Sequence, residues 1–400
     1  MRGEIVSIGS ELLLGQIVDT NAAFIARHLA AIGLDLFHKT TVGDNLARVA
    51  DAVTTALGRA HVVITTGGLG PTADDVTREA VARATGRRLV FVPELMRDIE
   101  AFFQARGFTL SPSNRKQAYI PEGALPLPNP VGTAPCFMVQ EGDRALISLP
   151  GVPREMEHLL LTRVIPYLRE RYRLRGAIVS RILRVCGLGE SRVGEIIGDY
   201  MVSGANPTVG TMAHLGQVDV RIAAKADDEA AARAMIAPVE AEIRARLGDL
   251  IFGVDTETLE GVVASGLLAR NWTVGLLEAG TGGLVAERLT GIPGSAERVH
   301  GLVTASEAGA RRLGLADGTA AELAEAARNW AKADLAATVI MGPPEGEGAR
   351  LIYPTWVGVA TPGRMAQHDY RFGGDLAQVR VRACVMTLDR LRRVLMSGSA

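Results

Sequence analysis

The chain has 400 residues, which is enough for two to four domains that each bury a core of their own. Its 43 lysines and arginines nearly balance 44 aspartates and glutamates, which argues against nucleic acid and membrane surfaces as partners and favours a small ligand. Cys136, Cys186 and Cys384 have neither CxxC nor zinc-type spacing, and no apolar run has the length of a membrane span. These features predict a cytoplasmic protein without disulfides or a structural metal.

Apolar strands alternate with amphipathic helices in the first third of the chain. Strands are expected at EIVSIG, DLFHKTTV and HVVITT, and helices over about Asn21 to Ile32, around Ala50 and from about Asp75. This alternation indicates a parallel sheet covered on both faces. The sequence therefore predicts a doubly wound, three-layer α/β/α domain over residues 1–170.

The pattern changes twice after this domain. The strand VSRILRVCG, a helix that begins at GES, the strand VDVRIAAKA and an alanine-rich helix predict a small α+β module over residues 171–254. From Thr256 onward, a long helix, the strand WTVGLL, the glycine turn EAGTGG and the strands DLAATVIM and LIYPTWVGVA predict an α/β domain over residues 255–400. A helix after Gly374 is expected to end it.

The segment HVVITTGGLGPTADDVT contains the most informative turn of the chain. An apolar strand leads into glycines and then into a helix N-terminus, which directs backbone N–H groups and the positive end of the helix dipole at an anion. The phosphate of a nucleotide-like or pterin-like small molecule is the expected ligand. The predicted binding residues are Gly67, Gly68, Leu69, Gly70, Thr72 and Asp74.

Carboxylates follow the glycines directly, at Asp74 and Asp75. Acids beside a phosphate require a divalent cation between them, or they contact ligand hydroxyls and amines instead. Helix capping is the alternative interpretation of this pair. Asp44 ends another strand and is the expected partner of Asp75, because ligands of open α/β sheets gather at such ends. Further candidates for the pocket rim are Glu11, Asp19 and Asn21, and candidate donors to a second phosphate or the ribose are Asn114, Arg115 and Lys116. Each of the six is equally explained as a solvated or capping residue.

Six segments carry a family resemblance: GSELLLGQIVDTNAAFIARHL, TTVGDN, TTGGLGPTADDVT, SNRKQAYIPEGA, LPNPVGTAP and LPGVPREM. In this order they resemble the N-terminal domain of the CinA family, the competence/damage-inducible protein A group. Its fold is similar to that of the molybdopterin-binding MogA and MoaB proteins, whose two aspartates fall here on Asp44 and Asp75. The resemblance implies metal-dependent hydrolysis of ADP-ribose to AMP and ribose 5-phosphate, with these aspartates as catalytic and metal-binding residues for Mg²⁺, Mn²⁺ or Co²⁺, and it implies a homodimer. Cys136 departs from the family, which often has glycine there, and is expected to narrow the pocket.

The other two segments resemble the rest of the same family. The middle module is similar to a KH-like unit, but GLGES does not supply the GXXG loop with basic flanks that nucleic-acid binding needs, so we interpret it as a spacer and dimerisation element. EAGTGGLVAERLTGIPGSA resembles the start of a domain that is a nicotinamide mononucleotide deamidase in many relatives. Its serine, tyrosine and lysine fall here on Ala279, Ala305 and Ala310, which implies an inactive domain. Thr281 is a poor substitute nucleophile, because no basic residue accompanies it in the motif.

Three functions stay open at this point. The chain is a metal-dependent hydrolase of ADP-ribose or a related nucleoside diphosphate sugar, a non-catalytic molybdopterin-binding protein, or a scaffold that only senses nucleotides. Chelation of the metal and the variants Asp44→Ala and Asp75→Ala distinguish them. A hydrolase loses turnover under these changes, whereas a binding protein shows affinity without turnover.

Overall fold

A computed structural model of the chain shows two compact units, each with sheets of its own. The first unit comprises Met1–Val179 with Ala224–Ala234, and the second comprises Ser180–Ala223 with Met235–Ala400. The residues that the structure describes are 1–174, 176–304, 309, 318–346 and 351–397. Among these residues, no helix combines the length and the apolar character needed to cross a membrane.

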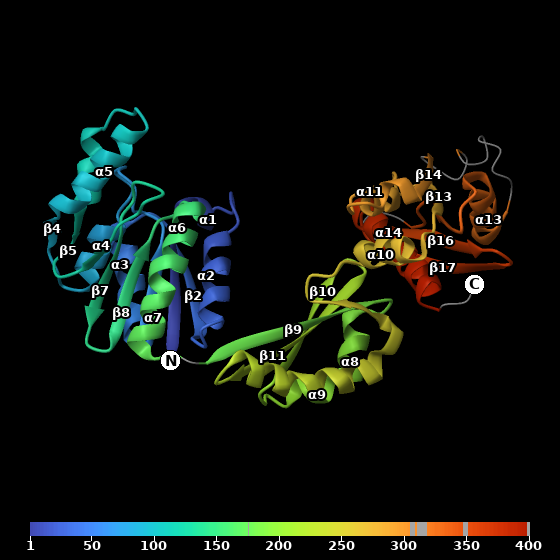
Figure 1. Cartoon of the computed structure of the whole chain (residues 1–400), viewed down its shortest axis with the longest axis horizontal. Helices are drawn as coiled ribbons and strands as arrows, with labels where there is room; N and C mark the ends of the chain where they lie inside the picture. Colours follow the sequence, from blue (N-terminus) through green and yellow to red (C-terminus); the bar gives the residue numbers. More distant parts are fainter. Residues whose placement is uncertain (175, 305–308, 310–317, 347–350, 398–400) are drawn as a thin grey trace. The chain divides into compact units, whose positions relative to one another are not determined.

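The first unit is built on a six-stranded sheet with the order β2-β1-β3-β8-β7-β6 (Figure 1). The strands are β1 (Arg2–Ile8), β2 (Asp35–Val42), β3 (Val62–Thr66), β6 (Leu125–Leu127), β7 (Cys136–Glu141) and β8 (Arg144–Leu149). The first three and β8 run parallel, whereas β7 is antiparallel to β8 and β6 is antiparallel to β7. The prediction of a wholly parallel sheet is therefore wrong at one edge, because the short turn at Gly142 permits only a hairpin.

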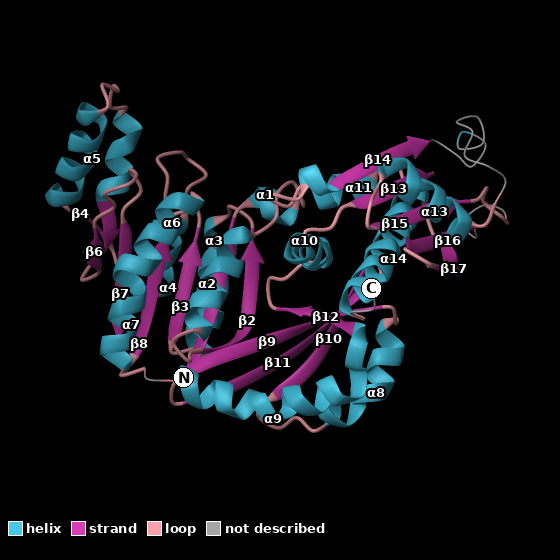
Figure 2. Ribbon diagram, turned by 45° about the vertical axis from the view of Figure 1, so that its right-hand side comes forward, coloured by secondary structure: helices cyan, strands magenta, loops and turns pink. Residues whose placement is uncertain are grey.

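Helices cover both faces of this sheet (Figure 2). Val6 of β1 packs with Val49 in one core, and its neighbour Ile5 packs with Ile25 in the other, as the alternation of side chains along a strand requires. The predicted three-layer architecture is thereby confirmed. The remaining elements are α1 (Ser10–Leu13), α2 (Thr20–Ala30), α3 (Leu46–Arg59), α4 (Thr77–Ala84), α5 (Pro93–Ala105), α6 (Pro153–Leu159), α7 (Ile165–Tyr172), a 3₁₀ helix (Pro112–Ala118), a π-helical turn (Leu160–Val164), β4 (Leu89–Phe91) and β5 (Tyr119–Pro121).

The middle module has a four-stranded sheet with the order β10-β11-β9-β12. Its elements are β9 (Ala177–Cys186), α8 (Glu190–Val202), β10 (Thr208–His214), β11 (Gln217–Ala226), α9 (Glu229–Leu247) and β12 (Ile251–Val254). The predicted α+β class is confirmed. The sequence prediction missed β10, which forms a hairpin with β11 through Gly216 at a φ of 79°.

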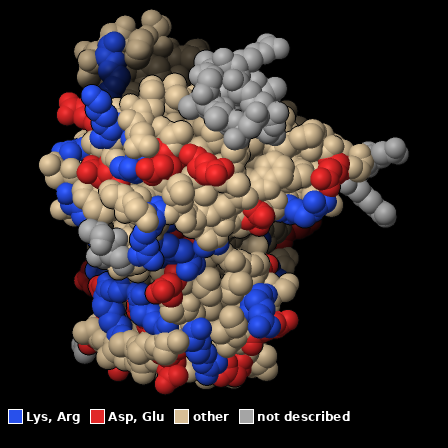
Figure 3. All heavy atoms as spheres, turned by 90° about the vertical axis from the view of Figure 1, so that its right-hand side faces the viewer, with Lys and Arg blue, Asp and Glu red and all other residues tan. Residues whose placement is uncertain are grey.

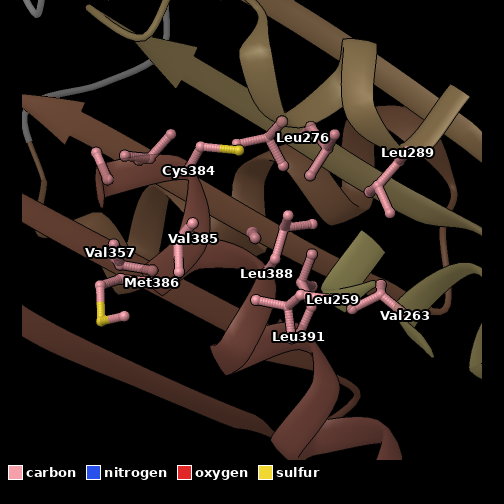
Figure 4. Packing of buried hydrophobic residues seen from close by; sticks show 14 of the residues in the cluster. Leu259, Val263, Leu276, Leu289, Val357, Cys384, Val385, Met386, Leu388 and Leu391 are labelled. Carbon is pink, nitrogen blue, oxygen red and sulfur yellow. The ribbon is translucent and has the colours of Figure 1, made fainter. Parts of the chain in front are cut away.

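The C-terminal domain has a five-stranded sheet with the order β14-β13-β15-β16-β17. Leu276 of the sheet packs with Leu259 and Leu388 on one face (Figure 4), and Leu277 packs with Leu323 on the other. The domain is therefore α/β, as predicted. Its elements are α10 (Leu259–Arg270), β13 (Val274–Ala279), α11 (Leu284–Thr290), β14 (Val299–Thr304), α13 (Ala320–Ala331), β15 (Leu335–Met341), β16 (Ile352–Thr361), β17 (Arg364–Gly373) and α14 (Leu376–Met396).

Candidate functional site

A cavity of about 110 Å³ lies where β1 and β3 end, at the carboxyl edge of the parallel strands. Ligands of open α/β sheets bind at this edge, because the loops that follow neighbouring strands meet there. Four of the predicted site residues line it: Glu11, Asp19, Asn21 and Gly67. The full lining is Ile8, Glu11, Leu12, Ile17, Val18, Asp19, Thr20, Asn21, Thr66, Gly67, Gly151 and Pro153.

Asn21, in the first turn of α2, joins three segments of the chain at this cavity. Its Nδ2 donates to the carbonyl oxygen of Gly151 at 2.7 Å and to the Thr66 hydroxyl at 3.3 Å. Since a carbonyl only accepts, this contact fixes which end of the amide faces Gly151. The Oδ1 atom is buried and has no hydrogen-bond partner among the residues that the structure describes. A buried acceptor without a donor is costly, so this atom suits a ligand that brings a hydroxyl or amine.

The two carboxylates of the rim differ in how they are held. Asp19 caps α2 by accepting from the Ala22 amide at 2.9 Å, and its other oxygen accepts from the Ser7 hydroxyl at 2.7 Å. Glu11 is exposed, and its carboxylate accepts no hydrogen bond from a described residue; only its backbone carbonyl oxygen accepts one, from the Gln16 amide at 3.0 Å. Glu11 is thus available to a ligand, whereas Asp19 supports the local structure.

The glycine turn after β3 requires glycine for two different reasons. Gly67 and Gly68 have φ values of 106° and 63°, in the left-handed region that other residues rarely adopt. Gly70 has no such φ, but a Cβ there would lie 2.4 Å from Oδ2 of Asp75. Conformation explains the first two glycines, and close approach of the Asp75 carboxylate explains the third.

The amide groups of this turn supply donors for an anion. Within the described residues, the N–H groups of Gly68, Leu69 and Gly70 donate to no protein acceptor, whereas the Gly67 amide donates to the carbonyl oxygen of Leu149 at 3.1 Å. Three of the four predicted amides therefore remain available as donors, because the Gly67 amide already donates to Leu149. The Thr77 hydroxyl is also used, since its Oγ1 donates to the carbonyl oxygen of Gly67 at 2.8 Å.

Arg78 binds backbone carbonyl oxygens of the same turn. Its side chain is 1% exposed, and it donates to the carbonyl oxygens of Gly70, at 3.2 Å, and of Leu69. Burial lowers the pKa of Arg78 to about 10, which leaves it charged at neutral pH. This residue was not predicted from the sequence, because no local pattern distinguishes a buried arginine from a solvated one in the first turn of a helix.

Asp44 and Asp75 follow β2 and β3, whose ends both align with the end of β1. Oδ2 of Asp44 accepts from the Ser10 amide at 2.7 Å, and Oδ2 of Asp75 accepts from the Thr72 amide at 2.8 Å and from its hydroxyl. Neither carboxylate lines the cavity, and each keeps Oδ1 free of donors from the described residues. The capping alternative is wrong, because α4 begins after Val76 without a side-chain cap.

The remaining predicted residues lie around this turn or away from it. Asp74 is exposed, and Lys116 binds the backbone carbonyls of Thr72, at 3.1 Å, and of Asp75. Asn114 is 5% exposed and uses both ends of its amide locally, on the Ser111 amide at 3.0 Å and on Gln117 at 2.9 Å. Each end of its amide therefore already has a partner within the protein.

Cys136 does not narrow the cavity, contrary to expectation. It lies in β7, is completely buried, and packs in the core that contains Ile25 and Ile147. Burial raises the pKa of its thiol well above the usual range, so it stays protonated. Its side chain belongs to the core because alternate residues of β7 face that side of the sheet.

The donor chemistry at the edge of the sheet fits a hard divalent cation shared with a substrate. No group of three or more His, Cys, Asp or Glu side chains in the described part of the chain is arranged to hold a metal ion by itself. Mg²⁺, however, usually binds through one or two carboxylates together with substrate phosphates and water. Asp44 and Asp75, each with one free oxygen, supply carboxylates of this kind.

The glycine turn of the C-terminal domain is organised by Glu278. This carboxylate is 1% exposed and accepts from the Thr281 hydroxyl at 2.6 Å and from the amides of Val285 and Ala286 at 3.1 and 2.8 Å, which caps α11. Thr281 therefore contacts a carboxylate and not a basic residue, and both oxygens of this carboxylate are held by the helix amides. Ala279 ends β13 and is completely buried, and Ala305 and Ala310 lie outside the described residues.

Comparisons with known proteins cover all three parts of the chain. Residues 4–170 match the family model described as "Probable molybdopterin binding domain", residues 180–253 match the "Damage-inducible protein CinA KH domain", and residues 256–395 match the "CinA C-terminal domain". A relative from Alkaliphilus oremlandii, named as a competence-damage inducible protein, is 40% identical over 415 residues and covers 100% of both chains. The chain belongs to the CinA family.

A second curated relative agrees with this assignment, and one solved structure is also similar to part of the chain. A CinA-like protein from Dictyoglomus thermophilum is 39% identical over 412 residues, which cover 99% of this chain and 100% of the relative. A crystal structure of CinA from Thermoplasma acidophilum, described as of unknown function, is 36% identical and covers 42% of this chain and 97% of that one, with a TM-score of 0.39. The three CinA segments follow the predicted order, and the boundaries after residues 170 and 254 stay a prediction.

Proposed function

We propose that the N-terminal domain hydrolyses ADP-ribose, or a related nucleoside diphosphate sugar, to AMP and ribose 5-phosphate. The observation that carries this proposal is the combination of three free amides at Gly68–Gly70 with the buried, unpartnered Oδ1 of Asn21 at one edge of the sheet. A nucleoside diphosphate sugar brings phosphate oxygens that accept from amides and sugar hydroxyls that donate to Asn21.

Each group of the edge has a role in such a reaction. The amides of Gly68–Gly70 hold one phosphate, and Asn21 orients a sugar hydroxyl. A water oxygen attacks one phosphorus, the bond from that phosphorus to the bridging oxygen breaks, and the water proton passes to a carboxylate oxygen of Glu11. A divalent cation held by Asp44 and Asp75 supplies charge neutralisation on the phosphate oxygens when it is bound.

The experiment is incubation of the full chain with ADP-ribose and Mg²⁺, Mn²⁺ or Co²⁺, with AMP measured by chromatography. Asp75→Asn keeps the size of the side chain and should abolish metal-dependent AMP release. The matched control is Asp51→Asn, an exposed aspartate of α3 outside the site, which should retain it. Absence of AMP with every metal, in a folded sample, would contradict the proposal.

The match of residues 4–170 to a molybdopterin-binding model favours a second candidate function. In this alternative the same amides and Asn21 bind a phosphate-bearing pterin, or sense a nucleotide, without turnover. Binding that persists in the presence of a chelator, with no product from ADP-ribose, would favour this alternative over hydrolysis.

We also propose that the C-terminal domain has lost deamidase activity, and that the protein is a homodimer. Ala279 offers a methyl group where the resemblance places a nucleophilic hydroxyl, and a methyl group can neither attack an amide nor transfer a proton. Ammonia release from nicotinamide mononucleotide that disappears in Thr281→Ala would overturn the first statement. Light scattering from the eluting protein tests the second.

A further inference from the structure

A second, larger cavity of about 370 Å³ lies in the C-terminal domain, between the β16–β17 hairpin and the last turns of α14. It lies at the opposite end of the sheet from Ala279. Ala279 pairs with Ile340 near the end of β15, whereas Ala336, at the start of β15, pairs with Ala360 beside the cavity. The cavity is therefore separate from the deamidase-like turn.

Two arginine side chains of α14 line this cavity, and each donates a hydrogen bond within the protein through its Nε atom. Nε of Arg390 donates to the Tyr370 hydroxyl at 2.8 Å, and Nε of Arg393 donates to Oδ2 of Asp389 at 2.8 Å. Within the described residues, the terminal nitrogens of both side chains donate to no protein acceptor. Anchoring reduces the conformational entropy that each guanidinium loses when it binds a ligand.

The side chains around the cavity carry more positive than negative charge. Asp389 is 2% exposed and pairs with Arg393 and, at 2.6 Å, with Arg392. In the part of the chain that the structure describes, no acid pairs with Arg364 or Arg390, which also line the cavity. Figure 3 shows acidic and basic side chains interspersed over much of one face. We therefore expect this cavity to bind an anion.

His368 adds a titratable group to the same wall. Burial lowers the pKa of His368, and the charge of Arg390 lowers it further. The arginine charges that disfavour the imidazolium would be compensated by an anion bound between them. The rest of the wall includes the apolar side chains of Val359 and Val394.

We propose that this cavity binds a small molecule of the nucleoside diphosphate class, with its phosphates on Arg364, Arg390 and Arg393 and its apolar part on Val359 and Val394. Its volume lies within the range of small-molecule sites, and a guanidinium binds phosphate through two parallel hydrogen bonds. This inference is independent of the hydrolysis proposed for the N-terminal domain.

The test is hydrogen exchange of the full chain, followed by mass spectrometry, with ADP, pyrophosphate or adenosine added in the presence of a chelator. ADP should protect peptides of β17 and the end of α14 more strongly than pyrophosphate does, and adenosine should not protect them. Arg390→Gln should weaken ADP binding by about tenfold or more, as expected for the loss of a charged hydrogen bond. Peptides over residues 62–77 report separately on the N-terminal site.

Two further variants make the result decisive. Arg371→Gln is the matched control, because Arg371 is an exposed arginine of the same strand that pairs with Glu345 and does not line the cavity. Arg364→Gln removes an exposed side chain without a protein partner and keeps the test valid if Arg390→Gln does not fold. No protection at millimolar ADP, equal protection by adenosine, or full affinity in both cavity variants would overturn the proposal. Protection that rises with protein concentration alone would also overturn it, by indicating a second copy as the occupant.

Discussion

Replacing Gly67 with alanine should destabilise the N-terminal domain more than the same change at another glycine of positive φ. The φ of Gly67 is 106°, and an added Cβ would lie 2.1 Å from the carbonyl oxygen of Ile8. That oxygen belongs to β1, which is paired on both sides in the middle of the sheet. The strand cannot move away without disturbing its hydrogen bonds to β2 and β3.

The expected loss has two parts. A non-glycine residue in this backbone region costs about 1–3 kcal/mol. Overlap with a fixed neighbour adds about 1–3 kcal/mol, as in an overfilled core. We therefore expect Gly67→Ala to lower the free energy of unfolding by about 2–6 kcal/mol. Gly86→Ala is the control, because Gly86 has a φ of 64° but no atom within 4 Å of the added Cβ, and it should show only the first part.

The assay must report on the N-terminal domain alone. All three tryptophans, at positions 272, 330 and 356, lie in the C-terminal domain, so their fluorescence does not follow this change. Hydrogen exchange of β3 and β8 peptides at increasing denaturant measures the local free energy of opening instead. Equal losses in Gly67→Ala and Gly86→Ala would refute the reasoning, because they would show that the contact with Ile8 has no energetic effect.

Further predictions concern both domains. Asn21→Leu should raise KM for ADP-ribose in steady-state kinetics, because it removes the acceptor for the sugar; an unchanged KM would contradict that role. Glu278→Gln should lower the stability of the C-terminal domain by about 1–3 kcal/mol in urea titrations followed by tryptophan fluorescence, because an amide NH₂ then faces helix N–H donors. Burial raises the pKa of Glu4, but the hydrogen bonds and charge of Arg59, together with the Thr40 hydroxyl and His38, outweigh burial and hold the pKa below the usual value. The stability that Glu4 contributes is therefore present above the unfolded pKa and lost as the pH falls through the folded pKa, and Glu4→Gln should flatten this acid limb of the unfolding curve. Ala279→Ser alone should release no ammonia from nicotinamide mononucleotide, and substantial release would show that the remaining groups of the site are functional.

Local patterns were sufficient for the class of the fold and for the position of the glycine turn. Strand and helix periods are properties of consecutive residues, so the layers could be predicted without a structure. Gly67 and Gly68 have positive φ, because a strand that turns sharply into a helix requires it. The antiparallel pairing of β7 was not predicted, because pairing direction depends on which strands become neighbours.

Only the tertiary structure decided which polar groups are free. Asn21 meets Gly151, 130 residues away, and this contact leaves its Oδ1 buried without a donor. Asp75 turns back to Thr72 instead of capping α4, and Arg78 is buried beneath the glycines. The sequence by itself determined the elements and the residue types at the edge of the sheet, because these follow from local chemistry. Their availability for binding depends on hydrogen-bond partners brought together by long-range packing, which no local pattern encodes.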